Sequence, residues 1–207
     1  MVRSYWTIFL LIFLIKLDGS EIIKRVKEDL IFYAAKKNDF KLAKYCIDNG
    51  IGDVNYIQHC SYSPTPLMVA CKNLNLKLIK LFLDNGASVE FVNFFGEHAL
   101  YYILWNLKSK YEKSNNIEGF MLKIKKIVLL FLDKKININD GNRFGETILI
   151  RAVKKELPAD VIAILLEYGA DPFLRDKESR MAIDYTRDQQ IKKLLNANNY
   201  KPSCAIL

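Results

Sequence analysis

The feature that most constrains the fold of this 207-residue chain is an internal repeat. The apolar segment Tyr45–Gly50 recurs as Leu81–Gly86, as Phe131–Lys135 and as Leu165–Gly169. Its last position falls at residues 50, 86, 135 and 169, so the steps are 36, 49 and 34 residues. Self-similarity at such periods is typical of solenoids and other stacked arrays. We therefore expect one stack of similar units.

A second motif precedes each recurrence. Ser63–Leu67 aligns with Gly96–Leu100, Gly145–Leu149 and Ser179–Ile183. Between the two motifs, apolar residues recur at helical spacing, as in Ile79–Leu83. One helix pair cannot bury such an apolar stripe by itself, whereas stacked neighbours can. The residue pattern alone therefore predicts an all-helical solenoid of helix hairpins.

Together the two motifs resemble the ankyrin repeat family. Its pattern is a turn with Gly-x-Thr-Pro-Leu-His, a short helix with Ala, a second helix ending in Leu-Leu, and Gly-Ala before a hairpin. Thr65–Leu67 with Ala70, and Leu81–Ala87, match this pattern closely. The resemblance implies an all-α ankyrin-repeat solenoid of stacked helix hairpins joined by short β-hairpin or turn connections. Within a domain at 21–197, the expected units are about 28–58, 59–92, 93–141, 142–175 and 176–197, of which the first and last are caps.

The sequence departs from the family pattern in two ways. The motif histidine is replaced by Met68, Tyr101, Ile150 and Asp184, which weakens hydrogen bonding in the turn but not the packing. The third unit carries an insertion between Asn106 and Phe120. Long insertions in repeat proteins map to one face, often the binding face.

The N-terminal residues 1–20 have the order of a secretory signal. Arg3 precedes the apolar run Ile8–Ile15, and small residues follow at Gly19 and Ser20. The run is too short to span a bilayer as a helix, which takes about 20 residues. We expect this segment to be removed on export. The alternatives are an uncleaved anchor and an apolar helix that packs on the repeats.

The tail at 198–207 ends in Cys204-Ala-Ile-Leu, which matches the pattern for prenylation of Cys204. Prenylation takes place in eukaryotic cytosol and so conflicts with the signal segment. The signal segment and the prenylation motif can both be used only in a bacterial protein that is delivered into a host cell. Such a protein would be associated with a membrane.

The sequence offers no constellation for catalysis, a cofactor or a metal. Its four cysteines lack metal-site spacing, and Cys46 and Cys71 fall at apolar helix positions that indicate small buried side chains. His98 occupies the Thr position of its repeat, where we expect a capping or turn hydrogen bond. A histidine acting as a base also needs a partnered nucleophile or carboxylate. His59 and Cys60 are adjacent in sequence, which is not how nucleophiles are usually activated. We therefore expect a protein that is not an enzyme.

The net charge of +8 is concentrated in one segment, since Trp105–Lys135 holds eight lysines and three acidic residues. Its lysines at 108–126 are compatible with nucleic-acid binding or with a solvated helical face. The segment contains no Arg, which usually leads base recognition, and this favours the solvated face over a nucleic-acid partner.

The candidate binding surface is a row of aromatic residues. The residue before each turn is aromatic in three successive units, and nearby phenylalanines add apolar area. Exposed aromatics are typical interface anchors, although packing of each ring on the neighbouring hairpin is equally open. We expect lysines of the insertion to steer an acidic partner surface toward this row. The predicted residues are Tyr62, Phe91, Phe94, Phe95 and Phe144, with Lys108, Lys110 and Lys113.

These features favour a monomeric, non-catalytic scaffold that binds another protein in the periplasm or outside the cell. The alternative is a host-directed bacterial effector that is prenylated at Cys204 and associated with a membrane. An enzyme is the third class, and no residues support it. The sequence does not identify the partner, because repeat surfaces vary on a constant core.

Overall fold

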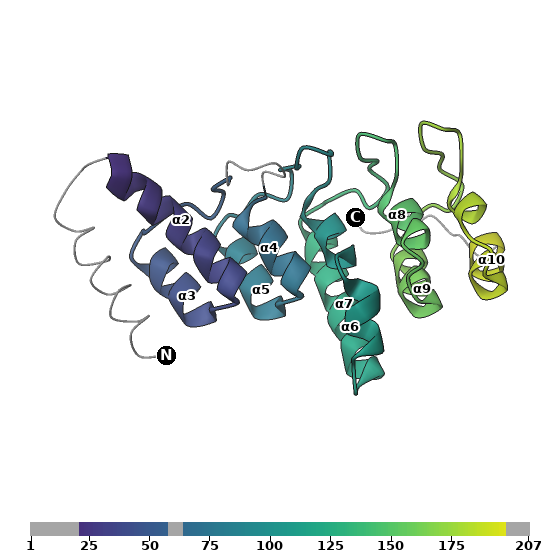
Figure 1. Cartoon of the computed structure of the whole chain (residues 1–207), viewed down its shortest axis with the longest axis horizontal. Coiled ribbons are helices and arrows are strands. Elements are labelled where there is room, and N and C mark those ends of the chain that lie inside the picture. Colours follow the sequence, from purple (N-terminus) through teal and green to yellow (C-terminus); the bar gives the residue numbers. More distant parts are fainter. Residues whose placement is uncertain (1–20, 58–63, 198–207) are drawn as a thin grey trace.

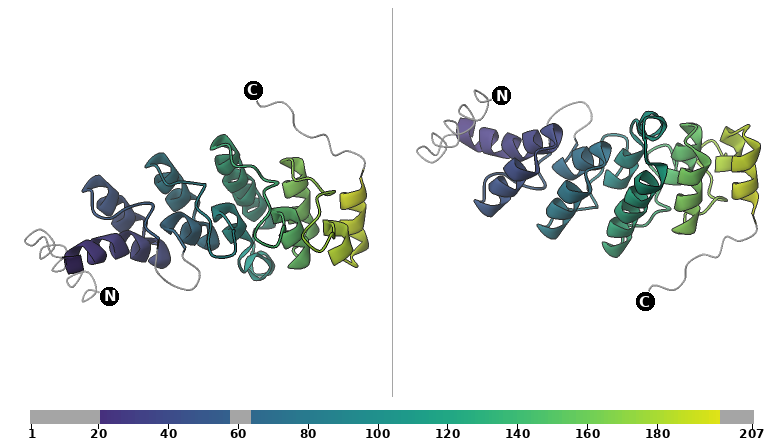
Figure 2. Two further views of the ribbon diagram at one scale, coloured as in Figure 1. Left: turned by 90° about the horizontal axis from the view of Figure 1, so that it is seen from above. Right: turned by 90° about the horizontal axis from the view of Figure 1, so that it is seen from below.

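The computed structural model describes residues 21–57 and 64–197, with side chains from residue 29 onward. The described residues form an elongated stack of helix pairs, each packed on the next (Figures 1 and 2). This confirms the predicted all-helical solenoid. The predicted signal segment at 1–20, the aromatic residue Tyr62, the pair His59 and Cys60, and the candidate lipidation site Cys204 lie outside the described residues.

Helices form two layers along the stack. The inner layer consists of α2 (Glu21–Lys37), α4 (Pro66–Asn73), the 3₁₀ helix η1 (Ala99–Leu104), α8 (Ile148–Lys154) and the 3₁₀ helix η2 (Ala182–Tyr185). The outer layer consists of α3 (Phe40–Asp48), α5 (Leu76–Asp84), α7 (Ile117–Asp133), α9 (Ala159–Glu167) and α10 (Gln189–Asn196). Within the layers, α4 contacts α2 and η1, and α7 contacts α5 and α9. Each internal unit is therefore supported by its neighbours on both sides, and each terminal unit by one neighbour.

Polar side chains fix where several helices begin. The Thr65 hydroxyl accepts a hydrogen bond from the Met68 amide at 3.3 Å, and the Thr147 hydroxyl accepts one from the Ile150 amide at 3.2 Å. Asn75 caps α5 in the same way. Replacing such a cap by alanine costs about 1 kcal/mol, so these residues set the register of the motif along the stack.

A continuous apolar core lies between the layers. Phe82 and Phe131 of the outer helices are fully buried, as is Leu149 of the inner layer. Cys46 and Cys71 are also fully buried, and both are free thiols. The prediction that these two cysteines serve as small core residues is confirmed.

The last unit covers the end of the stack. Ile191 and Leu195 of α10 are buried, and Ile183 is partly buried against the core. Leu194 is half-buried. Because α10 packs on α9, these side chains shield the apolar face of the fourth unit from water.

The third unit differs from its neighbours. Its outer helix α7 has 17 residues, whereas α5 and α9 have nine each. The insertion forms α6 (Leu107–Glu112), which reaches the next unit. Lys108 Nζ lies 3.2 Å from Glu156 Oε2, and the Tyr111 hydroxyl donates to Asp160 Oδ2 at 2.9 Å. The insertion therefore straps the third unit to the fourth, at the end of the helices opposite the projecting loops (Figure 1).

Candidate protein-binding surface

Three connections project from the stack, and we call them fingers: residues 87–98, 136–147 and 170–181 (Figure 1). Each finger contains a buried Asn or Asp, namely Asn93, Asn142 or Asp176. The Oδ1 atom of that residue accepts hydrogen bonds from the backbone N–H groups two and four residues further on, at 2.8 to 3.0 Å. One short side chain thereby fixes the turn of each finger.

Neighbouring fingers are joined by backbone hydrogen bonds. The Arg143 amide donates to the Phe95 carbonyl at 2.8 Å, and the Lys177 amide donates to the Phe144 carbonyl at 3.0 Å. Gly96 permits the first of these close approaches. Its φ is +75°, and a Cβ there would lie 2.9 Å from the Arg143 nitrogen. The fingers therefore stack in a fixed register.

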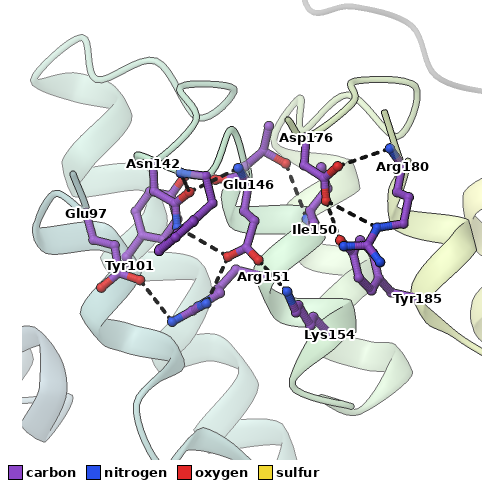
Figure 3. A network of polar contacts seen from close by, with 12 residues as sticks. Glu97, Tyr101, Asn142, Glu146, Ile150, Arg151, Lys154, Asp176, Arg180 and Tyr185 are labelled. Atoms are coloured by element: carbon purple, nitrogen blue, oxygen red, sulfur yellow. Dashed lines mark hydrogen bonds and ion pairs between the residues drawn. The ribbon is translucent and has the colours of Figure 1, made fainter. Parts of the chain in front are cut away.

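An ionic network links the third and fourth units beneath the fingers (Figure 3). Arg151 bridges two buried carboxylates, with Nη2 at 3.2 Å from Glu97 Oε1 and Nη1 at 2.8 Å from Glu146 Oε2. Lys154 Nζ lies 2.7 Å from Glu146 Oε1, and the Tyr101 hydroxyl donates to the Glu146 carbonyl at 2.7 Å. Burial alone would raise the pKa of Glu146. The Lys154 hydrogen bond, the Arg151 charge and the Asn142 hydrogen bond outweigh burial and lower it.

A similar arrangement holds the last finger. The Tyr185 hydroxyl donates to Asp176 Oδ2, and the Arg180 guanidinium lies over the Tyr185 ring at 4.6 Å (Figure 3). Burial would raise the pKa of Asp176, but the Tyr185 hydrogen bond and the backbone hydrogen bonds lower it. Burial and the Asp176 hydrogen bond raise the pKa of Tyr185 to about 12. Both networks support the fingers.

Phenylalanine rings cluster on the outside of this support. Phe94 and Phe144 are 59% and 52% exposed, and Phe95 lies half-buried between them. The rings of Phe95 and Phe144 stack with centroids 6.5 Å apart, and Phe94 meets Phe95 edge-on at 5.5 Å. Arg143 lies over the Phe94 ring at 4.8 Å. The three rings, which we call the finger row, form one apolar strip on fingers that are hydrogen-bonded to one another.

The sequence matches family models of proteins with this architecture. A family model described as ankyrin repeats (3 copies) matches residues 8–93 and 30–116. A second model, described as ankyrin repeats (many copies), matches residues 132–185. The chain belongs to the ankyrin repeat family.

Relatives of this ankyrin repeat protein come from viruses and bacteria. An ankyrin repeat protein of fowlpox virus is 28% identical over 176 residues, which cover 84% of this chain and 46% of that protein. One from Acanthamoeba polyphaga mimivirus is 36% identical over 72 residues, covering 35% of this chain and 44% of its own length. One from Borreliella burgdorferi is 30% identical over 95 residues, covering 44% and 23%. The chain spans less than half the length of each of these relatives.

The ankyrin fingers contain most of the predicted aromatic residues. Phe91 is 37% exposed on the same finger as Phe94 and Phe95, and Phe144 stacks from the next finger. Sequence reasoning missed Phe173, which is 56% exposed on the third finger. The available signal was its place just after Gly169-Ala170, whereas the predicted aromatic residues lie at or next to the position before the turn.

The predicted lysines do not join the finger row. Lys108 pairs with Glu156, and the Lys110 ammonium donates to the Lys72 carbonyl at the end of α4. Lys113 is exposed just after α6. The inner helices run from the fingers toward α6, so these lysines and the phenylalanines lie at opposite ends of those helices (Figure 1).

The expected hydrogen bond of His98 is absent, which corrects the sequence interpretation. His98 is 5% exposed, and among the described residues neither ring nitrogen has a hydrogen-bond partner. Its ring instead packs edge-on against Tyr101, with centroids 4.7 Å apart. Burial lowers the pKa of His98 to about 4, so the ring is neutral at physiological pH.

The buried thiols are poor nucleophiles. Burial, and then the nearby Asp39 charge, raise the pKa of Cys46 to about 11, and burial raises the pKa of Cys71 well above its usual value. A reactive cysteine needs a lowered pKa and an accessible sulfur atom. Within the described ranges, no group of three or more His, Cys, Asp or Glu residues is arranged to hold a metal ion.

Proposed function

We propose that this protein is a non-catalytic scaffold that binds another protein through its finger row. Ankyrin repeats are protein–protein interaction modules, so a protein partner is the family's general function. The finer assignment rests on the exposed rings of Phe94 and Phe144, which the fingers present without needing them for the core. Aromatic side chains on a rigid base bind with little loss of conformational entropy.

A site-specific crosslink tests this assignment. A photoreactive phenylalanine analogue at position 94 should capture a partner that the same analogue at Leu129 does not capture. Leu129 is a suitable control because it is 40% exposed on the outer helix α7, away from the fingers. Recovery of the same proteins from both positions would contradict a binding surface on the fingers.

The absence of catalysis is inferred from chemistry rather than from fold. The two described cysteines are buried with raised pKa values, and His98 faces a tyrosine ring rather than a nucleophile. The carboxylates of Glu97 and Glu146 are engaged by Arg151. Groups that are fully engaged in a structural network are not available as general acids or bases.

We propose further that the chain is exported to the periplasm or outside the cell, with its N-terminal segment removed. The support is the order of Arg3, the apolar run Ile8–Ile15 and the small residues Gly19 and Ser20. Within the described ranges, no helix is long and apolar enough to cross a bilayer. N-terminal sequencing of the natural protein should find a start near Glu21. An intact Met1 on a soluble protein would instead support the alternative in which this segment packs on the repeats. The first ankyrin match begins at residue 8, inside this segment, and is compatible with that alternative.

The effector alternative depends on Cys204. A Cys204→Ser variant should fold with unchanged stability, because the position follows Lys201-Pro202-Ser203 in a tail beyond the helical pattern. Loss of membrane association in that variant would favour a prenylated effector over an exported scaffold. An unchanged distribution between soluble and membrane fractions would remove the effector hypothesis.

A further inference from the structure

The last turns of the inner helices carry a row of cations. Lys36, Lys72 and Lys154 each lie two residues before the left-handed residue that ends the inner helix. Those left-handed residues are Asn38, Leu74 and Glu156, with φ values of 61°, 56° and 50°. Equivalent positions of stacked repeats line up along the solenoid. We call the set Lys36, Lys37, Lys72, Trp105, Lys154 and Lys155 the basic row.

In the third unit, Trp105 occupies the position that Lys37 and Lys155 hold in their units, one residue before the left-handed residue. It follows η1 directly and precedes the left-handed residue Asn106. The Lys72 ammonium lies 4.6 Å from its ring centroid, and the Lys155 ammonium lies 5.8 Å from it. Tyr102 stacks with the same ring at 6.1 Å, with 19° between the ring planes. One half-buried indole therefore gathers cations from the second and fourth units.

The cations around Trp105 are only partly balanced: the charges of Glu97 and Glu146 act on Lys155, but neither carboxylate forms an ion pair with it. Among the described residues, Lys72 and Lys155 form no ion pair, and the neighbouring Glu156 is engaged by Lys108. Lys110 adds a third ammonium, which donates to the Lys72 carbonyl. Burial, then the charges of Lys72 and Lys123, lower the pKa of Lys110. The ammonium groups of Lys72, Lys110 and Lys155, none of them in an ion pair among the described residues, favour an anionic group that arrives from outside.

We propose that the basic row binds an extended acidic segment of a partner protein, with its carboxylates on Lys72 and Lys155 of the row and on the adjacent Lys110 of α6, around Trp105. This rests on the proposed protein-binding function and adds the chemistry of the partner. It also defines a second surface, because the finger row and the basic row lie at opposite ends of the inner helices (Figures 1 and 2). Carboxylates can pair with the ammonium groups while the cation–π contacts of Trp105 stay in place.

A single-stranded nucleic acid is the competing anion. Its bases would need to stack on Trp105, since stacking on aromatic side chains supplies much of such binding. That ring is already contacted by Tyr102 and by the ammonium groups of Lys72 and Lys155, and a base would have to displace them. The basic row also contains no arginine. The geometry therefore favours the acidic protein segment.

The test uses the fluorescence of Trp105 in the full chain. Trp6 and Trp105 are the two tryptophans of the sequence, so a Trp6→Phe background isolates the Trp105 signal. A short oligoglutamate peptide should change the Trp105 emission in a saturable and salt-sensitive way. The double variant Lys72→Gln/Lys155→Gln should weaken peptide binding about tenfold or more. The charge-matched control Lys77→Gln/Lys80→Gln, at exposed positions of α5, should leave the affinity unchanged.

Three outcomes would overturn the proposal: equal weakening in both double variants, peptide binding with no change in Trp105 emission, or tighter binding of a single-stranded oligothymidylate with the same Trp105 response. The proposal and the broader function fail separately. A Phe94→Ser/Phe144→Ser variant should bind oligoglutamate normally while losing the natural partner. If the unmodified basic row does not bind oligoglutamate but Phe94→Ser/Phe144→Ser still loses the natural partner, the acidic-segment proposal is rejected and the finger row remains the binding surface.

Discussion

The third and fourth repeat units begin with nearly the same motif and fold differently. In the fourth, the Thr147 hydroxyl accepts the Ile150 amide hydrogen bond and the α-helix α8 follows. In the third, His98 has nearly the same backbone angles, φ −78° and ψ 174° against −70° and 167°, but makes no side-chain cap. The shorter 3₁₀ helix η1 follows. The finger is thus set by the Asn and Gly of the turn, whereas the helix after it depends on the cap residue.

The third unit compensates for its weak inner helix with contacts from outside the motif. Lys108 and Tyr111 of α6 reach across to Glu156 and Asp160 of the fourth unit. Lys125 Nζ of α7 lies 2.7 Å from Glu167 Oε2 of α9. The third unit therefore relies on contacts with its neighbour where the fourth has a side-chain cap on its inner helix.

Removing the bridge between the two units should have the largest effect. An Arg151→Met variant leaves Glu97 and Glu146 buried without their shared cation, although Lys154 still contacts Glu146. We expect a loss of about 3 kcal/mol in the free energy of unfolding, measured by urea denaturation. Adding Glu97→Gln to this variant should recover part of the loss. A loss below about 1 kcal/mol would show that the bridge is peripheral.

Lowering the pH should destabilise the protein through the buried His98 of the third unit. Its pKa falls from 6.5 when unfolded to about 4 when folded, so the unfolded state binds more protons between these values. Stability should therefore fall as the pH falls from 6.5 toward 4, by about 3 kcal/mol in total. A His98→Phe variant should lack this loss between pH 6.5 and 5, above the range where carboxylates titrate. Identical pH profiles for both proteins would mean that His98 is not buried in solution.

Restoring the cap should make the third unit resemble the fourth. A His98→Thr variant can accept the hydrogen bond that Thr147 accepts in α8. We expect a gain of about 1 kcal/mol in stability, reduced by the lost ring contact with Tyr101. Thr147→His is the reciprocal change and should destabilise by a similar amount. If both variants destabilise the protein, the ring packing of His98 outweighs the missing cap.

Loosening the strap should have an effect as small as that of the cap. The Tyr111 hydroxyl bond to Asp160 and the Lys108 pair with Glu156 are exposed, and exposed contacts of this kind contribute about 0.5 kcal/mol each. A Lys108→Met/Tyr111→Phe variant should therefore lose about 1 kcal/mol and show faster hydrogen exchange in η1 than in α8. Equal exchange changes in both helices would contradict a local strap.

Much of the fold was predictable from the sequence because each repeat unit can be aligned with the others in the same chain. The glycines after the outer helices, the Thr-Pro-Leu turn and the apolar stripes each recur. A helix or turn predicted in one unit therefore supports the same prediction in the next. The sequence places the insertion between Asn106 and Phe120, and the structure has α6 and the start of the long helix α7 in this segment. The unit that the insertion contacts was not predictable, because the sequence of a lysine-rich helix does not indicate which neighbouring unit it packs against.

The candidate site was predictable only in part. Phe95 and Phe144 could be named because they sit at a fixed position of the turn motif, and Phe94 because it lies next to Phe95 in the sequence. The meeting of Lys72, Trp105 and Lys155 was missed because it joins three units through contacts that no single repeat contains. His98 was misjudged because its position predicts a cap, whereas packing against Tyr101 left its nitrogens unbonded.

The most direct test of the central claim measures binding and stability in one variant. Once the partner is captured, its dissociation constant should rise at least tenfold with Phe94→Ser/Phe144→Ser, while the free energy of unfolding changes by less than about 1 kcal/mol. Leu129→Ser, at a similarly exposed position, should change neither quantity substantially. Unchanged affinity, or a loss of several kcal/mol in stability, would show that these rings serve the fold rather than a partner.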